Sequence, residues 1–198
     1  MKEIVVATKN AGKVAELAAA LAPLHIVVKS VSDYGNIEEP EETGTTFTDN
    51  ALLKARYYAK ATGRACLADD SGLEADGLDG EPGVYSARFA GPGATDSANN
   101  KKLLAELNAR PGVVRTARFR CVLAFCDTNG QVLTANGTCE GVILEAPQGN
   151  AGFGYDPLFF MPEYNKTLAE MTVAEKNTVS HRGRAVQVMV EQLAGYLS

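Results

Sequence analysis

Thiol and imidazole side chains are scarce in this chain of 198 residues. Only two histidines are present, His25 and His181, and the four cysteines form no Cys-x-x-Cys pair. A zinc site is therefore not expected, because such sites gather closely spaced cysteines and histidines. The cysteines have apolar neighbours, and we expect buried, reduced thiols at Cys66, Cys121, Cys126 and Cys139.

The sequence also lacks an excess of basic residues and a long apolar run. Its formal net charge is -5, whereas a nucleic-acid partner requires a basic surface that neutralises phosphates. The apolar run at residues 4–7 is too short for a signal peptide, and no stretch approaches the roughly 18 apolar residues of a membrane span. We therefore expect a cytoplasmic protein with neither a nucleic-acid nor a membrane partner.

Strand and helix patterns alternate along the chain, whose length allows one substantial core. Helical patterns lie at residues 14–24, 47–62 and 96–109, and Ser180 is expected to cap a last helix. Apolar runs predict strands at residues 4–7, 25–28, 66–68 and 158–161, and Asn129-Gly130 predicts a hairpin between residues 115–127 and 131–144. Since a hairpin excludes a purely parallel sheet, we predict an α/β fold with a mixed central β-sheet flanked by helices, in a single domain over residues 1–198.

The first candidate site runs from Thr8 to Lys13, between a predicted strand and a predicted helix. Backbone N–H groups at the start of a helix attract an anion, and Asn10 and Lys13 add an amide donor and a positive charge. Ala7 and Val14 break the P-loop pattern, which excludes a Walker-type kinase or ATPase. We predict a phosphate-binding loop of another kind, and the alternative is an ordinary turn with solvated lysines.

Carboxylates gather in two further segments. Residues 38–42 contain four glutamates, and Asp69-Asp70 follows the predicted strand at residues 66–68. Like charges repel, so their convergence would require a cation, and Mg²⁺ prefers such oxygen ligands. One aspartate could hold the ion and also accept a proton from an attacking water. The alternative is a solvated acidic loop and an unrelated Asp-Asp-Ser-Gly turn.

The third candidate, residues 149–157, places Phe153 and Tyr155 among glycines. The order of the glycines does not fit the dinucleotide-binding fingerprint, which excludes a Rossmann site. Glycines let backbone approach a flat ligand, and either aromatic ring could stack on a nucleobase. The alternative is a turn whose aromatic rings belong to the core.

The fourth candidate comprises Lys176, His181 and Arg182, three hydrogen-bond donors near the predicted last helix. A 6-oxopurine presents an acceptor where adenine presents an amino group, so these donors would favour hypoxanthine or xanthine over adenine. The alternative is a Ser180 helix cap with exposed basic neighbours.

Together these segments resemble the inosine triphosphate pyrophosphatase family, also described as dITP/XTP pyrophosphatases. The resemblance covers nearly the whole chain. It rests on motifs in the order of the family: Thr8-x-Asn10-x-x-Lys13, Glu41-Glu42-Thr43-Gly44-x-x-Phe47, Asn50-Ala51-x-x-Lys54-Ala55, Ala68-Asp69-Asp70-Ser71-Gly72, Pro82-Gly83-Val84-Tyr85-Ser86-Ala87-Arg88, Gly152-Phe153-Gly154-Tyr155-Asp156-Pro157 and Ser180-His181-Arg182-Gly183.

The resemblance implies a role for each matching residue. Glu42 and Asp70 would bind Mg²⁺ with support from Asp69, and Asp70 would also be the catalytic proton acceptor. Lys54 would balance phosphate charge, and Ser71 would contact the substrate. The triphosphate would bind to Thr8, Lys9, Asn10, Ala11, Gly12 and Lys13, and the base to Phe153, Gly154, Tyr155, Asp156, Lys176, His181 and Arg182.

The same resemblance implies an activity, namely hydrolysis of ITP, dITP, XTP and dXTP to the monophosphate and pyrophosphate. It further implies an elongated fold of two lobes with an active-site cleft between them, and a homodimer. Two alternatives stay open: a related pyrophosphatase for modified pyrimidine nucleotides, and a nucleotide-binding regulator that does not hydrolyse its ligand.

Overall fold

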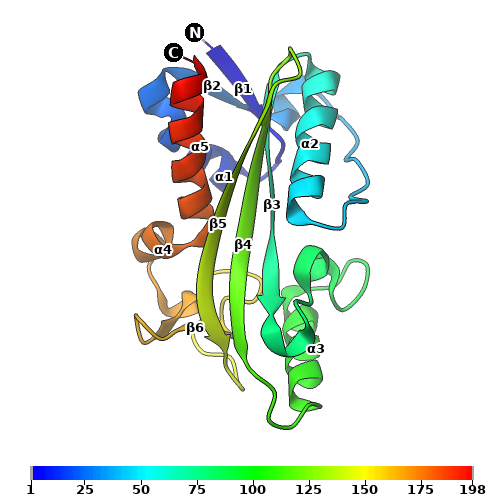
Figure 1. Ribbon diagram of the computed structural model, residues 1–198, viewed down its shortest axis with the longest axis vertical. Helices are drawn as coiled ribbons and strands as arrows, with labels where there is room; N and C mark the ends of the chain where they lie inside the picture. Colours follow the sequence, from blue (N-terminus) through cyan, green and yellow to red (C-terminus); the bar gives the residue numbers. More distant parts are fainter. Residues whose placement is uncertain (1, 198) are drawn as a thin grey trace. The chain divides into compact units, whose positions relative to one another are not determined.

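The computed structural model describes residues 2–197, which form two compact units (Figure 1). Unit 1 consists of the residues up to Asp70, Cys121–Gly137 and the residues from Arg184 onward. Unit 2 consists of Ser71–Arg120 and Thr138–Gly183. The single domain expected over residues 1–198 stays a prediction.

A seven-stranded sheet has the strand order β2-β1-β3-β4-β5-β6-β7. Strand β1 pairs in parallel with β2 and β3, whereas β6 pairs in antiparallel fashion with β5 and β7. The predicted α/β class with a mixed central sheet is therefore confirmed. The strands are β1 (Lys2–Val6), β2 (Ile26–Ser30), β3 (Ala65–Ala75), β4 (Thr116–Cys126), β5 (Val132–Ile143), β6 (Phe159–Met161) and β7 (Lys166–Thr167).

Helix α2 begins and ends where local signals predict. Helix α2 has the expected capping box, in which Thr46 and Asp49 bond each other's backbone N–H, and it ends at Gly63 in the left-handed conformation. No helix among residues 2–197 has both the length and the apolar character of a membrane span. The α-helices are α1 (Ala11–Leu21), α2 (Phe47–Thr62), α3 (Asp96–Asn108), α4 (Val173–Val179) and α5 (His181–Leu197), and the 3₁₀ helices are η1 (Ala22–Leu24), η2 (Val31–Tyr34), η3 (Asp76–Leu78), η4 (Gly83–Arg88) and η5 (Leu168–Glu170).

Two predicted boundaries beside the candidate site are wrong. Helix α1 begins at Ala11 rather than residue 14, because the Asn10 side chain caps it by accepting from the N–H groups of Gly12 and Lys13. Strand β3 does not end at residue 68 but continues through Asp69 and Asp70 to Ala75. The two aspartates are thus strand residues, which decides where their side chains point.

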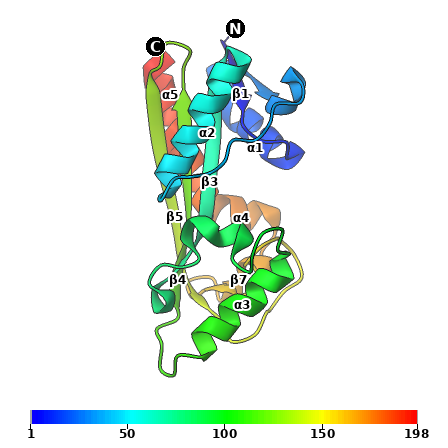
Figure 2. The same ribbon diagram turned by 90° about the vertical axis from the view of Figure 1, so that its right-hand side faces the viewer.

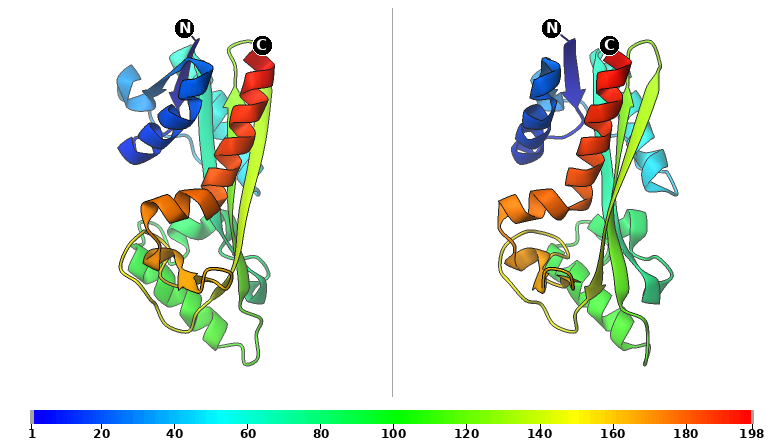
Figure 3. Two further views of the ribbon diagram at one scale, coloured as in Figure 1. Left: turned by 90° about the vertical axis from the view of Figure 1, so that its left-hand side faces the viewer. Right: turned by 60° about the vertical axis from the view of Figure 1, so that its left-hand side comes forward.

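In unit 1, helices cover both faces of the sheet. Figure 2, viewed from the α2 side, shows α2 in front of the strands and α5 behind them, and Figure 3 shows α5 from the opposite side. Helices α1 and α5 share one buried cluster with alternate residues of β1, β3 and β4, among them Leu17, Leu193, Ile4, Leu67 and Leu123. The intervening strand residues, such as Val5 and Cys66, are also buried and face α2 by the alternation of a strand.

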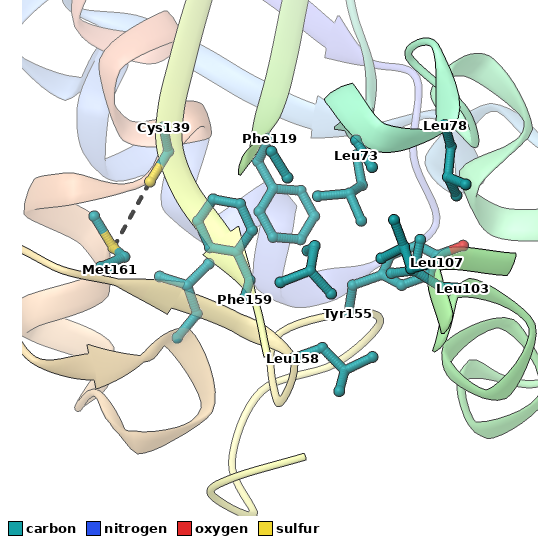
Figure 4. Packing of buried hydrophobic residues seen from close by; sticks show 14 of the residues in the cluster. Leu73, Leu78, Leu103, Leu107, Phe119, Cys139, Tyr155, Leu158, Phe159 and Met161 are labelled. Carbon is teal, nitrogen blue, oxygen red and sulfur yellow. Dashed lines mark hydrogen bonds between the residues drawn. The ribbon is translucent and has the colours of Figure 1, made fainter. Parts of the chain in front are cut away.

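In unit 2, a second core packs around two aromatic rings (Figure 4). The Phe119 and Phe159 ring centroids lie 4.7 Å apart at an angle of 49°. Cys139 is buried beside them, with its Sγ 3.8 Å from Met161 Sδ. All four cysteines of the chain are buried, as predicted, and burial raises the pKa of the Cys66 thiol to about 12.

Candidate active site

The parallel pairing of β1 and β3 brings two of the predicted segments together in unit 1. Val6 of β1 pairs with Leu67 of β3, and the Ala7 N–H donates to the Leu67 carbonyl over 2.9 Å. Because the two strands run parallel, the residues that follow Val6 and those that follow Leu67 continue in the same direction, side by side. The loop from Thr8 therefore lies beside Asp69 and Asp70.

The loop from Thr8 to Lys13 is held by a hydrogen bond of its own and by one from strand β2. The Asn10 N–H donates to Thr8 Oγ1 over 3.2 Å, and Ser30 Oγ donates to the Thr8 carbonyl over 2.9 Å. Lys9 is exposed and forms a surface ion pair of 3.3 Å with Glu39. The loop leads directly into α1, so the first N–H groups of that helix and the Lys13 ammonium lie at its end.

Asp69 and Asp70 bind cations from different helices. Lys13 Nζ lies 2.9 Å from Asp69 Oδ2, and Lys54 Nζ lies 3.2 Å from Asp70 Oδ1. Successive side chains of a strand point to opposite faces, and α1 and α2 cover opposite faces of this sheet. The two adjacent carboxylates are therefore directed apart.

Glu42 joins Asp70 at the same ammonium group. Lys54 Nζ lies 2.7 Å from Glu42 Oε1, and the three side chains are largely buried, with exposed fractions of 15% for Lys54, 27% for Glu42 and 11% for Asp70. Two carboxylates share one ammonium, so this trio carries a net negative charge. It is the strongest convergence of charge that the predicted site residues make in unit 1.

The pKa values of Asp70 and Lys54 reflect this imbalance. Burial, the largest influence, raises the pKa of Asp70, Lys54 lowers it and Glu42 raises it further. Burial would lower the pKa of Lys54, but Asp70 and Glu42 together keep it above its usual value. The ammonium is thus well compensated, whereas the ionised Asp70 is not.

The atoms around Asp70 fit a divalent cation. Asp70 Oδ2 and Asn50 Nδ2 are both buried, and neither atom makes a hydrogen bond within residues 2–197. Asn50 is nevertheless close enough to lower the pKa of Asp70. Mg²⁺ takes one or two protein carboxylates and fills its other positions with water and phosphate oxygens. Glu42 and Asp70 match that donor set. No group of three or more Asp, Glu, His or Cys side chains suited to a metal is found in the described part of the chain, so Asp69 does not join them in one cluster.

Asn50 fixes the segment that carries Glu42, a role that the sequence did not indicate. Asn50 is fully buried in α2, one helical turn before Lys54, and its Oδ1 accepts from the Gly44 N–H over 2.8 Å. A Cβ at Gly44 would lie 2.5 Å from that oxygen, so this close approach requires glycine. The signals in the sequence were a polar residue at a core position of a helix and its place in the motif with Lys54.

In unit 2, three of the predicted base-binding residues form one group. The Lys176 ammonium binds the Asp156 carboxylate and lies 4.8 Å from the centre of the Phe153 ring. Asp156 Oδ2 also accepts from the Phe153 N–H over 3.0 Å. The Phe153 side chain is 61% exposed, so its ring presents a face to a ligand. A Cβ at Gly152, which has φ +81°, would come within 2.2 Å of Asp156 Oδ2.

The other aromatic residue of this segment is a core residue. Tyr155 is buried, its hydroxyl donates to the Ser86 carbonyl over 2.8 Å, and burial raises its pKa. Ser86 also links β3 to the start of η4, since its hydroxyl accepts from the Leu73 N–H and donates to the Gly83 carbonyl. Of the two aromatic rings proposed for stacking, the structure therefore favours Phe153.

We expect Tyr155→Phe to lower the free energy of unfolding by about 1 kcal/mol, because it removes one buried hydrogen bond. The ring stays in the core, so kcat and KM should change by less than about twofold. Urea unfolding and steady-state kinetics measure the two effects. A KM that rises about tenfold at unchanged stability would instead give the hydroxyl the substrate contact that the family resemblance implies.

The remaining predicted residues lie at the junction of α4 and α5 and on β3. His181 is buried and stacks on Phe119, with ring centroids 5.0 Å apart and an angle of 15°. Ser180 caps α5 by accepting from the Gly183 N–H over 3.1 Å, as predicted, and Arg182 lies in the first turn. The Ser71 hydroxyl is buried and makes no hydrogen bond within residues 2–197.

Known proteins match this chain over nearly its full length. The sequence profile of the Ham1 family matches residues 4–192. This chain belongs to the Ham1 family. A dITP/XTP pyrophosphatase of Desulforamulus reducens is 53% identical over 191 residues, which are 96% of this chain and 95% of the relative. A dITP/XTP pyrophosphatase of Geobacter sulfurreducens is 51% identical over 98% of this chain and 97% of the relative.

Solved structures of the Ham1 family agree with the fold. A HAM1 protein from Coxiella burnetii is 42% identical with a TM-score of 0.94, covering 98% of this chain and 100% of that one. A nucleoside-triphosphatase / dITP/XTP pyrophosphatase from Mycobacterium abscessus is 43% identical with a TM-score of 0.81, covering 94% of this chain and 98% of that one. The family that the motifs indicated is thus the family that the comparisons find.

Proposed function

We propose that this chain hydrolyses noncanonical purine nucleoside triphosphates, such as ITP, dITP, XTP and dXTP, to the monophosphate and pyrophosphate with Mg²⁺ as cofactor. The activity is the one that the names of its relatives carry. The observation that supports the chemistry best is the trio of Lys54, Glu42 and Asp70, with an Asp70 oxygen buried and without a hydrogen bond.

The triphosphate is assigned to the loop from Thr8 to Lys13. Asn10 uses its oxygen as a helix cap, and its Nδ2 group keeps N–H donors for a phosphate oxygen. The start of α1, with Ala11 and Gly12, adds backbone N–H groups, and Lys13 adds a positive charge that Asp69 orients. Lys54 balances phosphate charge from the side of α2.

Asp70 is assigned the proton transfer. A water that attacks the α-phosphorus loses a proton, and pyrophosphate leaves from the opposite side. Asp70 Oδ2 would accept that proton, and a buried carboxylate with a raised pKa is a stronger base than an exposed one. Lys13 and Lys54 stabilise the charge on the departing pyrophosphate.

Glu42 and Asp70 would hold Mg²⁺. The ion would polarise the phosphate oxygens and compensate the excess negative charge of the two carboxylates. Asp69 acts on this site through the charge it adds near Lys54, whose pKa it helps to raise.

Base recognition is assigned to unit 2. The exposed Phe153 ring would stack on the purine, and Asp156 fixes both the Phe153 backbone and the Lys176 ammonium. Lys176, His181 and Arg182 are donors that suit the 6-oxo group of hypoxanthine and xanthine. Ser71 contributes a hydroxyl on β3, and Gly154 and Tyr155 shape the segment.

A substrate panel tests the proposal. The kcat/KM for ITP, dITP or XTP should exceed that for ATP by about 100-fold or more, because several donors would face the adenine amino group. Pyrophosphate and phosphate are assayed separately, with a chelated sample as the control for the metal. Release of phosphate, or preference for a modified dUTP, would contradict the proposal.

Two further properties belong to the proposal and rest on the family resemblance. The protein would act as a homodimer, and it would act in the cytoplasm. Sedimentation velocity distinguishes a dimer near twice the 21.0 kDa chain mass from a monomer.

A further inference from the structure

Helix α3 binds both backbone polar groups of Gly154, the residue that follows Phe153. Asp96 Oδ2 accepts from the Gly154 N–H over 2.7 Å, and Asn100 Nδ2 donates to the Gly154 carbonyl over 2.8 Å. Asp96 and Asn100 are four residues apart, so they project from one face of α3. The donor and the acceptor of one residue are thus both bound by the same helix.

The helix that makes these contacts is itself anchored. The Thr95 side chain caps α3, and Asn99 is buried, with its Oδ1 2.8 Å from the Ala90 nitrogen and its Nδ2 3.2 Å from the Ala87 carbonyl. Ala87 lies in η4, next to the Ser86 carbonyl that binds the Tyr155 hydroxyl. Helix α3 and η4 therefore hold residues 154 and 155 from several points.

Gly154 needs such support because of its conformation. It has φ +61°, and no neighbouring atom within 4 Å of an ideal Cβ would keep it there by packing. A glycine in open space exchanges easily between conformations, and each change would turn the ring of the preceding residue. Figures 2 and 3 show this segment, in yellow, running beside α3.

We propose that Asp96 and Asn100 are positioning residues for base recognition: by binding both polar groups of Gly154, they fix the direction in which the Phe153 ring is presented. The proposal rests on the base-binding role given to Phe153 above. It predicts that the pair acts on the affinity for the purine and leaves the phosphate chemistry of unit 1 unchanged.

The test compares two disruptive and two conservative or distant variants. Asp96→Ala and Asn100→Asp each remove one bond to Gly154, and the second keeps the size of the side chain. Asp96→Asn keeps an oxygen acceptor for the Gly154 N–H. Lys101→Ala changes an exposed residue of the same helix and serves as the control.

Asp96→Ala and Asn100→Asp should each raise the KM for ITP and weaken IMP binding about tenfold, with kcat changed less than about twofold. Inhibition by inorganic triphosphate, which lacks a base, should not change. Asp96→Asn should restore most of the affinity, and Lys101→Ala should match the unaltered protein. Equal weakening of IMP and triphosphate, or no weakening of either, would overturn the proposal.

The two proposals fail in different ways. Binding of IMP is measured by calorimetry and does not depend on turnover, so the positioning role can be tested if the unaltered protein releases no pyrophosphate. Unaltered protein that does not bind IMP would refute the base-binding role of Phe153 and the positioning role with it. A variant that melts at the temperature of the unaltered protein and still loses IMP affinity excludes a merely structural effect.

Discussion

Asp70→Asn should lower kcat for ITP about 1,000-fold, because the amide cannot accept the proton from the attacking water. The substitution preserves size and shape, and Lys54 keeps its 2.7 Å contact with Glu42. Steady-state kinetics with pyrophosphate detection measure the loss. Asp79→Asn is the matched control, since the Asp79 side chain is 97% exposed and asparagine tolerates its φ of 56°.

The same substitution should leave the protein at least as stable at neutral pH. The pKa of Asp70 is raised in the folded protein, so folding favours its neutral form. The cost of burying the ionised carboxylate is fully present above the raised folded-state pKa and disappears as the pH falls towards the ordinary value of 3.8. Any advantage of Asp70→Asn in melting temperature should therefore shrink over that pH range. If Asp70→Asn retains turnover, Asp70 is not the proton acceptor.

Lys54→Met should lower the free energy of unfolding by about 3 kcal/mol, because it leaves two largely buried carboxylates facing each other without their cation. Turnover should fall on the order of 100-fold with the loss of charge near the phosphates. Thermal unfolding and kinetics measure the two effects. Lys60→Met, at an exposed position of α2, is the control.

Added Mg²⁺ should raise the melting temperature of Lys54→Met more than that of the unaltered protein. Without the ammonium, Glu42 and Asp70 bind a divalent ion more tightly, and an ion that binds only the folded state stabilises it. Ca²⁺ and Na⁺ provide the comparison for charge and size. Equal responses of the two proteins to Mg²⁺ would mean that these carboxylates do not hold the ion.

The features that the sequence predicts well are those whose causes are local. Both ends of α2 follow from Thr46, Asp49 and Gly63, which act within one turn of the helix. The hairpin between β4 and β5 follows from Asn129-Gly130, since Gly130 has φ 87° and its N–H bonds the Asp127 carbonyl. The composition of residues 38–42 and 69–70 predicted only that carboxylates from both segments meet around a cation, and the family resemblance singled out Glu42 and Asp70.

The features that escaped prediction depend on distant partners. Aspartate is disfavoured in strands, so the sequence predicts a loop at Asp69 and Asp70. The ion pairs of their carboxylates with Lys13 and Lys54, which allow the strand to continue, come from distant segments. The spacing of residues 149–157 could not show that Phe153 is exposed and Tyr155 is buried. The burial of Tyr155 depends on a hydrogen bond to the Ser86 carbonyl, which is distant in the sequence. The contacts of Asp96 and Asn100 with Gly154 span 58 and 54 residues and have no local signature.

Because β3 continues through Asp69 and Asp70, the side chains of these two consecutive residues lie on opposite faces of the sheet. One carboxylate is linked through Lys13 to the helix behind the phosphate loop, and the next through Lys54 to the helix beside Glu42. A substitution in either helix therefore acts first on the carboxylate that its lysine contacts, and the charge of Asp69 reaches the other site only through its influence on the pKa of Lys54. In the proposed mechanism, phosphate binding and proton abstraction thus belong to opposite faces of the sheet, even though a single peptide bond joins Asp69 to Asp70.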